Sequence, residues 1–246
     1  MKRVRLDQLL VERGLAESRE QAQRLIRAGE VTVAGHPAAK PGQDVPPDST
    51  VTIRTPPRFV SRGGEKLEAA FTAFELAVER LDCLDVGAST GGFTDCLLQH
   101  GAARVIALDV GRGQLHWRIR QDPRVAVIEG LNARYLKPGD LPFRPAFAVL
   151  DVSFISLTLV LPPVIDVLAE RAGLVTLIKP QFEAGRSEVG HGGVVRDPSV
   201  RQAVLARIRA FGSASGLEWR GVLDSPLPGP AGNVEMLAYW RKGDQG

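Results

Sequence analysis

The sequence predicts an α/β protein whose main domain has a mostly parallel, doubly wound β-sheet, preceded by a small α+β domain. Three observations support this prediction. From residue 81 onward, short apolar strands alternate with helical patterns, as in sheets built from strand–helix–strand units. The first of these strands runs into a glycine-rich turn. The first 55 residues contain two short helical patterns followed by short strands. We therefore expect domains at 1–55 and 65–246, joined by a linker at 56–64.

The N-terminal domain is predicted to begin with two helices. Leucines spaced at i, i+3 and i+4 between residues 5 and 13 form one apolar stripe, which is typical of a short amphipathic helix. Ser18 followed three residues later by Gln21 has the capping-box pattern that opens a second helix. Short strands are expected at 30–33 and 49–53, where β-branched residues alternate with polar ones.

The excess positive charge lies in the same N-terminal region. Residues 1–60 contain ten Lys/Arg and seven Asp/Glu, which accounts for the whole net charge of +3, because the remaining residues carry 21 of each sign. This placement is expected of a region that meets a polyanion such as RNA. An ordinary solvated surface explains the charge equally well.

The run RLDQLLVERGLAESREQAQRLIRAGEVTVAG, followed by DSTVTI, resembles an S4 RNA-binding domain. The resemblance implies that the second helix and the strand after it dock on structured RNA. The linker, with two prolines and a Gly-Gly pair, adds two further basic residues that RNA could contact. Taken singly, each basic residue is also explained by a solvated surface charge. The candidate RNA contacts are Arg3, Arg5, Arg19, Arg24, Arg27, Lys40, Arg58 and Arg62.

A glycine turn follows the first strand of the main domain. Its spacing is D-x-G-x-x-x-G-G-F, beginning at Asp85, and differs from the G-x-G-x-x-G of dinucleotide-binding enzymes. Glycines at such a turn let a ligand approach the backbone closely. The motif resembles the first motif of Rossmann-like class I methyltransferases, which implies S-adenosylmethionine as cofactor. The residues it implies in cofactor binding are Asp85, Gly87, Ala88, Ser89, Thr90, Gly91, Gly92 and Phe93.

The next two strands supply further candidates for the cofactor site. Asp109 ends the second strand, 22 residues after Gly87, where a carboxylate can accept both ribose hydroxyls of a nucleoside. The alternative is a strand-end aspartate that caps the following turn. The loop after the third strand, 125–128, reaches the adenine in methyltransferases, which makes Asn132 and Ala133 candidates.

Two charged residues end successive apolar strands. Asp151 follows the strand that starts at Phe147, and Lys179 follows the strand that starts at Leu174. The carboxyl ends of parallel strands are the edge at which open α/β sheets place ligands. A lone buried charge is costly at such a position, so either pairing or a functional role is favoured. A purely structural salt bridge remains the alternative.

With Lys66 and Glu235, these residues form a Lys-Asp-Lys-Glu set that resembles the set of FtsJ-like ribose 2′-O-methyltransferases. Together with SRGGEKL, DVGASTGGFTDCLL, LDVSFISL and LIKPQFE, the set makes nearly the whole chain similar to the TlyA family of bacterial rRNA (cytidine-2′-O)-methyltransferases, also described as hemolysins. The resemblance implies methylation of cytidines in large-subunit rRNA and, in some members, small-subunit rRNA.

The resemblance also suggests a division of roles among the four residues. We expect Lys179 to accept or steer the proton of the 2′-hydroxyl, and Asp151 to orient Lys179. Lys66 and Glu235 would position the ribose and its phosphate. The glycine-rich segment 188–196 is expected to cover the substrate ribose, ahead of a helix capped at Asp197.

Composition narrows the class of protein. A chain that is 44% hydrophobic and 24% charged is typical of a soluble domain, and the most apolar stretch, 154–165, is too short to cross a bilayer. The N-terminal stretch becomes charged too early for a signal peptide, so we expect a cytoplasmic protein. Its two cysteines have no C-x-x-C spacing and its four histidines have no ligand-like spacing, so no metal is expected.

Three other functions fit the sequence less well than rRNA methylation. A non-catalytic ribosome-assembly factor has no reason to retain four catalytic-type charges. A membrane-active hemolysin would need a spanning segment or a wide apolar helix face. An NAD-dependent oxidoreductase is disfavoured by the glycine spacing. Ribosomal RNA or a ribosomal subunit is therefore the expected partner.

Overall fold

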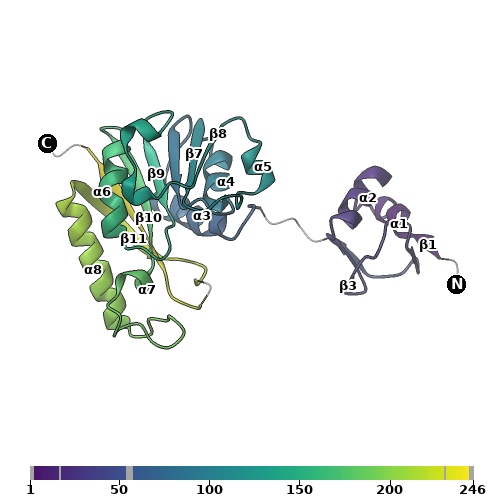
Figure 1. The fold of residues 1–246 in the computed structure, drawn as a ribbon. Helices are drawn as coiled ribbons and strands as arrows, with labels where there is room; N and C mark the ends of the chain where they lie inside the picture. The colour runs from purple at the N-terminus through teal and green to yellow at the C-terminus, as the bar shows by residue number, and fades with distance from the viewer. Residues whose placement is uncertain (1–2, 17, 54–57, 230, 244–246) are drawn as a thin grey trace. The chain divides into compact units, whose positions relative to one another are not determined.

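The computed structural model describes residues 3–16, 18–53, 58–229 and 231–243 (Figure 1). The chain divides into two compact units, Met1–Arg58 and Phe59–Gly246. The N-terminal unit has two helices, a three-stranded antiparallel sheet in the order β3-β2-β5, and a separate antiparallel pair of β1 with β4. Its elements are β1 (Val4–Arg5), α1 (Leu6–Glu12), α2 (Arg19–Arg27), β2 (Val31–Val33), β3 (His36–Pro37), β4 (Asp44–Val45) and β5 (Val51–Ile53).

The core of the N-terminal unit confirms the predicted apolar stripe. Leu6, Leu9 and Leu10 are buried beside Ala22 and Ile26 of α2. The predicted cap of the second helix is also present, because the Ser18 hydroxyl accepts a hydrogen bond from the Gln21 backbone N–H at 3.2 Å. Helix α1 also carries a buried acid that the sequence pattern did not indicate.

That acid is Asp7, which is completely buried. Arg5 forms an ion pair with it at 2.8 Å, Arg19 approaches at 3.4 Å, and the Gln23 amide donates to it at 2.9 Å. The hydrogen bond from Arg5 is the main reason that the pKa of Asp7 lies well below its usual range. A buried carboxylate that loses its partners is strongly destabilising, so Arg5 and Arg19 help to hold the first helix in place.

The second unit contains a seven-stranded sheet in the order β11-β12-β10-β9-β6-β7-β8, as predicted for an α/β fold. The five strands from β8 to β10 are parallel, and β12 runs antiparallel to both of its neighbours. The strands are β6 (Asp82–Val86), β7 (Arg104–Asp109), β8 (Val125–Glu129), β9 (Phe147–Leu150), β10 (Ala172–Ile178), β11 (Leu217–Asp224) and β12 (Met236–Lys242).

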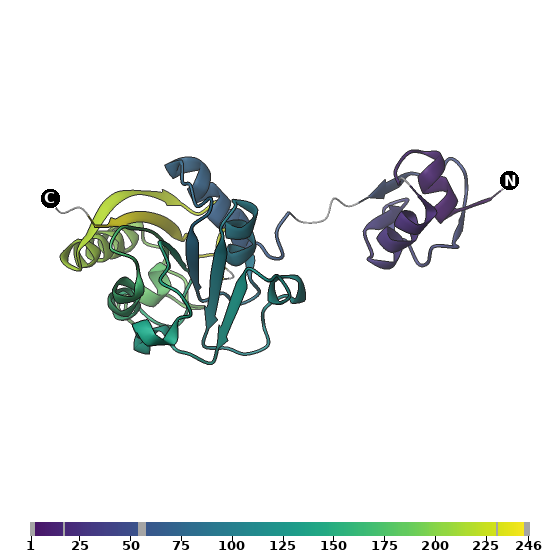
Figure 2. The same ribbon diagram turned by 90° about the horizontal axis from the view of Figure 1, so that it is seen from above.

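Helices cover both faces of this sheet (Figures 1 and 2). Helices α3, α4 and α5 pack in one apolar cluster, whereas α6 and α8 pack in another on the opposite face. Successive strand residues alternate between the clusters: Leu84 faces the second cluster and Cys83 the first. The helices are α3 (Gly63–Phe74), α4 (Gly92–Gln99), α5 (Trp117–Arg120), η1 (Ala133–Tyr135), η2 (Pro138–Asp140), α6 (Leu157–Val167), α7 (Pro180–Glu183) and α8 (Pro198–Ala214).

Strand order reverses at β6. The chain passes from β6 outward through β7 to β8, and then returns to place β9 on the other side of β6. Ligands bind at such a switch point, beyond the carboxyl ends of the two strands. Gly87 and Asp151 lie at this point, one after each strand. The fold therefore places the predicted glycine turn and a predicted catalytic acid beside each other.

The second unit begins earlier than the predicted start at residue 65. Phe59 is buried in its core, and the Val60 backbone N–H donates to Asp95 of α4 at 2.8 Å. Residues 56 and 57, at the start of the predicted linker, lie outside the described residues. Helix α3 starts at Gly63 and ends at Phe74, because Glu75 adopts the left-handed conformation that stops a helix.

The glycine-rich segment after α7 is attached to the loop before β12. The Asn233 amide donates to the Gly193 carbonyl and accepts from the Val195 N–H, each at 2.9 Å. Asp197 caps α8 by accepting from the Ser199 N–H at 2.8 Å, as predicted. That this segment covers the ribose stays a prediction. Among the described residues, no helix is long and apolar enough to cross a membrane.

Candidate active site

A cleft of about 1020 Å³ lies at the carboxyl ends of β6, β7 and β9. Gly87 and Ser89 of the glycine turn line it, together with Asp109, Asn132 and Ala133. The structure therefore brings together the residues predicted to hold the ribose and the base of a nucleoside cofactor. Apolar side chains from β6, β7 and α6 form part of the remaining wall: Val86, Leu108 and Val160.

Asp109 already holds the backbone of this cleft. Its carboxylate accepts from the Ser89 N–H at 2.8 Å and from the Gly111 N–H at 2.6 Å. Asp109 therefore caps the turn that follows β7, which is the alternative role predicted for this residue. Each carboxylate oxygen accepts more than one hydrogen bond, so these contacts leave capacity for a pair of ribose hydroxyls. The two backbone contacts fix the orientation of the Asp109 carboxylate, and so the direction from which it can accept further hydrogen bonds.

Asp85 lies beneath the glycine turn and is completely buried. Its Oδ2 accepts from the Thr94 hydroxyl at 2.7 Å, whereas Oδ1 has no hydrogen-bond partner among the described residues. Burial raises the pKa of Asp85 to about 7, and the negative charges of Asp151 and Asp109 add to the rise. A buried, half-satisfied carboxyl at the end of a central strand is expected where a polar ligand completes the hydrogen bonding.

Two glycines of the motif are required by space. A Cβ on Gly87, whose φ is +84°, would lie 2.4 Å from the carbonyl oxygen of Asp151. A Cβ on Gly92 would lie 2.2 Å from the Ser61 hydroxyl oxygen. The first glycine lets β6 and β9 remain adjacent at the switch point, and the second lets α4 begin against the segment before α3. Gly91, with φ +94°, precedes that helix as its cap.

A second cleft, of about 440 Å³, lies on the other side of the glycine turn. It shares Gly87, Ser89 and Asp151 with the first cleft. Its remaining wall carries the cation Lys66 from α3, and Arg62 just before that helix. The other members of the glycine motif that line it are Ala88, Thr90, Gly92 and Phe93.

The four predicted catalytic charges form two ion pairs. Lys179 Nζ lies 2.5 Å from Asp151 Oδ1 and donates to the Ser153 hydroxyl at 2.8 Å. Lys66 Nζ donates to Glu235 Oε2 at 2.6 Å. Asp151 and Lys66, one member of each pair, line the second cleft. Sequence analysis expected Asp151 beside Lys179, and did not anticipate the pairing of Lys66 with Glu235.

The pair of Lys66 and Glu235 is the more deeply buried. The side chains are 11% and 1% exposed, and Glu235 Oε1 has no hydrogen-bond partner among the described residues. Glu235 lies in the loop before β12, immediately ahead of the first residue of that strand, Met236. Because Lys66 is on α3, its ion pair with Glu235 connects α3 to the loop before β12. A buried charge pair with spare acceptor capacity is suited to bind a polar substrate group.

Some functional residues were missed by sequence reasoning. Phe154 is 90% exposed, has a φ of +63°, and its ring centroid lies 5.0 Å from that of Phe182. Both rings line the first cleft. A fully exposed phenylalanine in a strained backbone conformation is unusual in the absence of a ligand. The only sequence signal was an apolar residue between two serines, which reads as ordinary core.

Glu183 was also missed, although it belongs to the LIKPQFE motif. Its carboxylate accepts from the Ser156 hydroxyl and the Leu157 N–H, each at 2.7 Å. Burial raises the pKa of Glu183. Through these bonds Glu183 fixes the start of α6, and so supports the loop that carries Asp151 and Phe154. This is a positioning role.

The candidate RNA contacts belong to different surroundings. Arg24 and Arg27 are exposed in the last turn of α2, and Arg3 and Lys40 are exposed elsewhere in the N-terminal unit. Arg5 and Arg19 are partly exposed but engaged with Asp7. Arg62 lines the second cleft, and Arg58 is exposed at the end of the first unit.

Comparisons with known proteins match the two units separately. The model of the FtsJ-like methyltransferase family matches residues 59–242, and that of the S4 domain matches residues 4–51. The chain is 50% identical over 245 residues to the 16S/23S rRNA (cytidine-2′-O)-methyltransferase TlyA of Mycobacterium tuberculosis, covering 98% of this chain and 90% of that protein. It is 42% identical to hemolysin A of Brachyspira hyodysenteriae, covering 96% and 99%.

A solved structure supports the same grouping. The structure assigned to a hemolysin from Streptococcus thermophilus is 45% identical to the chain, with a TM-score of 0.76. The match covers 99% of this chain and 90% of that one.

Proposed function

The chain belongs to the TlyA family, in which an S4 domain precedes an FtsJ-like methyltransferase domain, and we propose that it methylates the ribose 2′-oxygen of cytidine in ribosomal RNA. One observation supports the proposal most strongly. Two ion pairs, Asp151–Lys179 and Lys66–Glu235, flank the glycine turn. The proposed substrate is ribosomal RNA, either free or in a ribosomal subunit.

The residues of the first cleft fit S-adenosylmethionine. Asp109 and Asn132 are placed for its ribose and adenine, and the turn at Gly87 admits a ligand against the backbone. Asp85 Oδ1 has no hydrogen-bond partner in the part of the chain that the structure describes, and the methionine end of the cofactor would supply one. When bound, S-adenosylmethionine supplies the activated methyl group.

Asp151 and Lys66, which line the second cleft, and their ion-pair partners would then align the acceptor. Lys179, held by Asp151 and Ser153, takes or steers the proton that leaves the 2′-hydroxyl. Lys66 and Glu235 orient the ribose and the adjoining phosphate. Alignment of well-oriented reactants lowers the activation barrier by about 7–11 kcal/mol, so holding this geometry supplies a large part of the rate enhancement.

The function is tested by transfer of radiolabelled methyl groups. The full chain is incubated with labelled S-adenosylmethionine and with 30S or 50S subunits from cells that lack the gene. We expect label in the RNA fraction. A chain that binds RNA and leaves it unlabelled under all these conditions would instead be a non-catalytic assembly factor.

Replacing Asp109 by alanine is expected to weaken binding of S-adenosylmethionine by about tenfold to a hundredfold, because hydrogen bonds donated to a charged acceptor contribute about 1.5–3 kcal/mol. Isothermal titration calorimetry measures the effect. Asp166, an exposed acid on α6, provides the matched alanine control. Equal affinity in the two variants would remove Asp109 from the cofactor site.

Replacing Phe154 by alanine is expected to lower kcat/KM for rRNA by about tenfold, because stacking of a base on an aromatic ring contributes about 1–3 kcal/mol. The exposed ring at the cleft is placed to receive the base of the target nucleotide. Phe154→Tyr should retain activity, because tyrosine keeps the aromatic ring at the cleft. If alanine and tyrosine variants are equally active, the ring has no such role.

Replacing Arg24 and Arg27 together by alanine is expected to weaken RNA binding and to reduce the slope of log affinity against log salt by about 2, one phosphate contact for each residue. Both side chains are exposed on α2. The control is the double variant Arg80→Ala, Arg220→Ala, which removes two exposed arginines of the second unit. Filter binding at several salt concentrations compares them, and equal slopes would exclude α2 from the RNA interface.

A further inference from the structure

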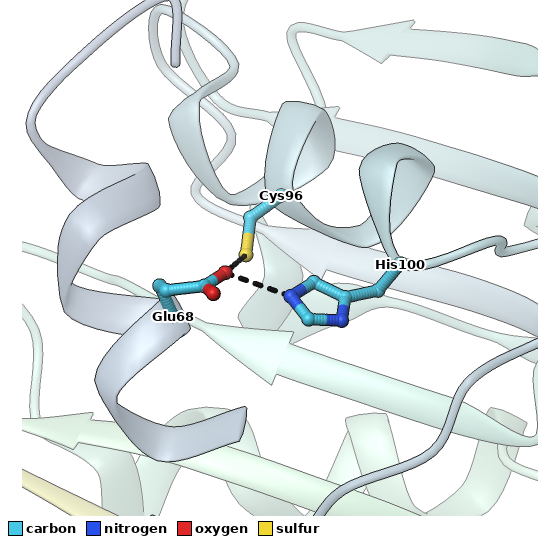
Figure 3. Close-up of side chains that lie close together, drawn as sticks. All are labelled: Glu68, Cys96 and His100. Atoms are coloured by element: carbon cyan, nitrogen blue, oxygen red, sulfur yellow. Dashed lines mark hydrogen bonds and ion pairs between the residues drawn. The ribbon is translucent and has the colours of Figure 1, made fainter. Parts of the chain in front are cut away.

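Helices α3 and α4 bring together three side chains that the proposed methyl transfer does not use. These are Glu68 on α3, Cys96 on α4, and His100, the residue that caps the C-terminal end of α4 (Figure 3). Cys96 and His100 are four residues apart, so they lie on one face of the helix. Sequence analysis expected no metal, because neither residue has a ligand-like neighbour of its own type. The third potential ligand comes from a different helix and appears only in the fold.

One candidate ligand atom from each residue lies within 4.8 Å of the other two. His100 Nε2 lies 2.7 Å from Glu68 Oε2, and Cys96 Sγ lies 3.8 Å from the same oxygen. Bonds from zinc to sulfur, nitrogen and oxygen of about 2.0–2.3 Å separate the ligand atoms of a tetrahedral site by about 3.3–3.6 Å. A coordination shell therefore needs the Nε2–Oε2 distance to lengthen by about 0.6 Å and the Sγ–Nε2 distance, which is at most 4.8 Å, to shorten by up to about 1.3 Å.

The surroundings hold two of the ligands in place and leave the cluster accessible. The His100 ring stacks on Phe71 at 3.9 Å with an interplanar angle of 12°, which fixes its direction. Cys96 is fully buried, whereas the side chains of Glu68 and His100 are 26% and 28% exposed. Water can thus reach the cluster from the side of the carboxylate and the imidazole. This arrangement suits three protein ligands and one water.

The cluster is distinct from the proposed catalytic centre. Glu68 follows Lys66 by two residues, which places the two side chains about 200° apart around α3. The cluster does, however, join the two helices on which the site depends, because α3 carries Lys66 and α4 follows the glycine turn.

We propose that Glu68, Cys96 and His100 bind one zinc ion, with water as the fourth ligand, and that the ion fastens α3 to α4. A thiolate, an imidazole and a carboxylate form a mixed set that suits zinc better than calcium or magnesium. Binding releases the thiol proton to solvent and leaves the oxidation state of every atom unchanged. The alternative is a hydrogen bond between Glu68 and His100 that lies over a buried thiol.

Cobalt provides a direct test, because a cobalt–thiolate bond gives a charge-transfer absorption that a nitrogen or oxygen ligand does not. The tag-free full chain is stripped with a chelator, dialysed, and titrated with Co²⁺. We expect a charge-transfer band that saturates at one equivalent and disappears when Zn²⁺ is added. Absence of the band in the wild-type chain would overturn the proposal without any variant.

Variants then identify the ligands. Cys96→Ala should abolish the band, and Glu68→Gln and His100→Gln should each weaken zinc binding by at least about tenfold in competition with a chromophoric chelator. The matched controls are Cys83→Ala and His116→Gln, which remove the other thiol and another imidazole. Zinc should raise Tm in both controls and not in Cys96→Ala. A band retained in Cys96→Ala, or lost equally in Cys83→Ala, would contradict the assignment.

Discussion

Replacing Lys179 by methionine is expected to lower kcat for methyl transfer by about a hundredfold to ten-thousandfold, the range that a positioned proton acceptor contributes. Lys179 lies 2.5 Å from Asp151 and is held by Ser153, at the carboxyl end of β10. Methionine keeps most of the length and apolar surface of the side chain and removes the ammonium group. Single-turnover assays with labelled S-adenosylmethionine and rRNA measure the rate.

Two controls distinguish a catalytic role from a structural one. The affinity for S-adenosylmethionine should remain unchanged in Lys179→Met, because this residue does not line the larger cleft. Lys137→Met, which removes an exposed lysine near η2, should retain wild-type kcat. If Lys179→Met transferred methyl groups at the wild-type rate, the ion pair with Asp151 would be structural.

Replacing Asp85 by asparagine is expected to stabilise the cofactor-free protein and to weaken its binding of S-adenosylmethionine. Burial raises the pKa of Asp85 to about 7, above the value of an unfolded chain. The folded state therefore binds the proton more tightly. The stability that proton binding to Asp85 contributes is fully present below about pH 4 and is lost as the pH rises toward 7.

The size of the effect follows from this shift. At pH 8 the asparagine variant should exceed the wild type in unfolding free energy by about 4 kcal/mol, and at pH 4 by less than about 1 kcal/mol. Urea denaturation at a series of pH values measures the difference. Asp82→Asn, at the start of the same strand, is the matched control, since Asp82 pairs with Arg104 at the surface. A pH-independent difference for Asp85→Asn would show that its carboxyl is not held neutral.

Sequence patterning was sufficient to predict the order of layers and the edge at which the site forms. Apolar strands that alternate with helices dictate a parallel sheet, and Gly87 marks where a ligand can approach the backbone. Asp151 and Lys179 follow successive strands, and parallel strands that are adjacent in space align their ends. Their contact therefore followed from topology alone.

Other features depended on contacts between distant segments. Lys66 and Glu235 are 169 residues apart, and no local pattern indicates that a buried ion pair joins them. Strand β11 was not predicted, although its residues alternate between exposed and buried or partly buried positions, as is typical of a half-buried strand. The same limitation applies to Asp7. No local pattern distinguishes it from the other acids of the sequence, and only the fold brings Arg5, Arg19 and Gln23 to its carboxylate.

Mapping the transferred methyl group tests the central claim most directly. Ribosomal RNA from cells lacking the gene is treated with the full chain and S-adenosylmethionine, digested with nucleases, and analysed by tandem mass spectrometry. We predict new methylation on the ribose 2′-oxygen of a defined cytidine, absent when Lys179→Met replaces the wild type. Methylation on a base, or none on any rRNA nucleotide, would contradict the account.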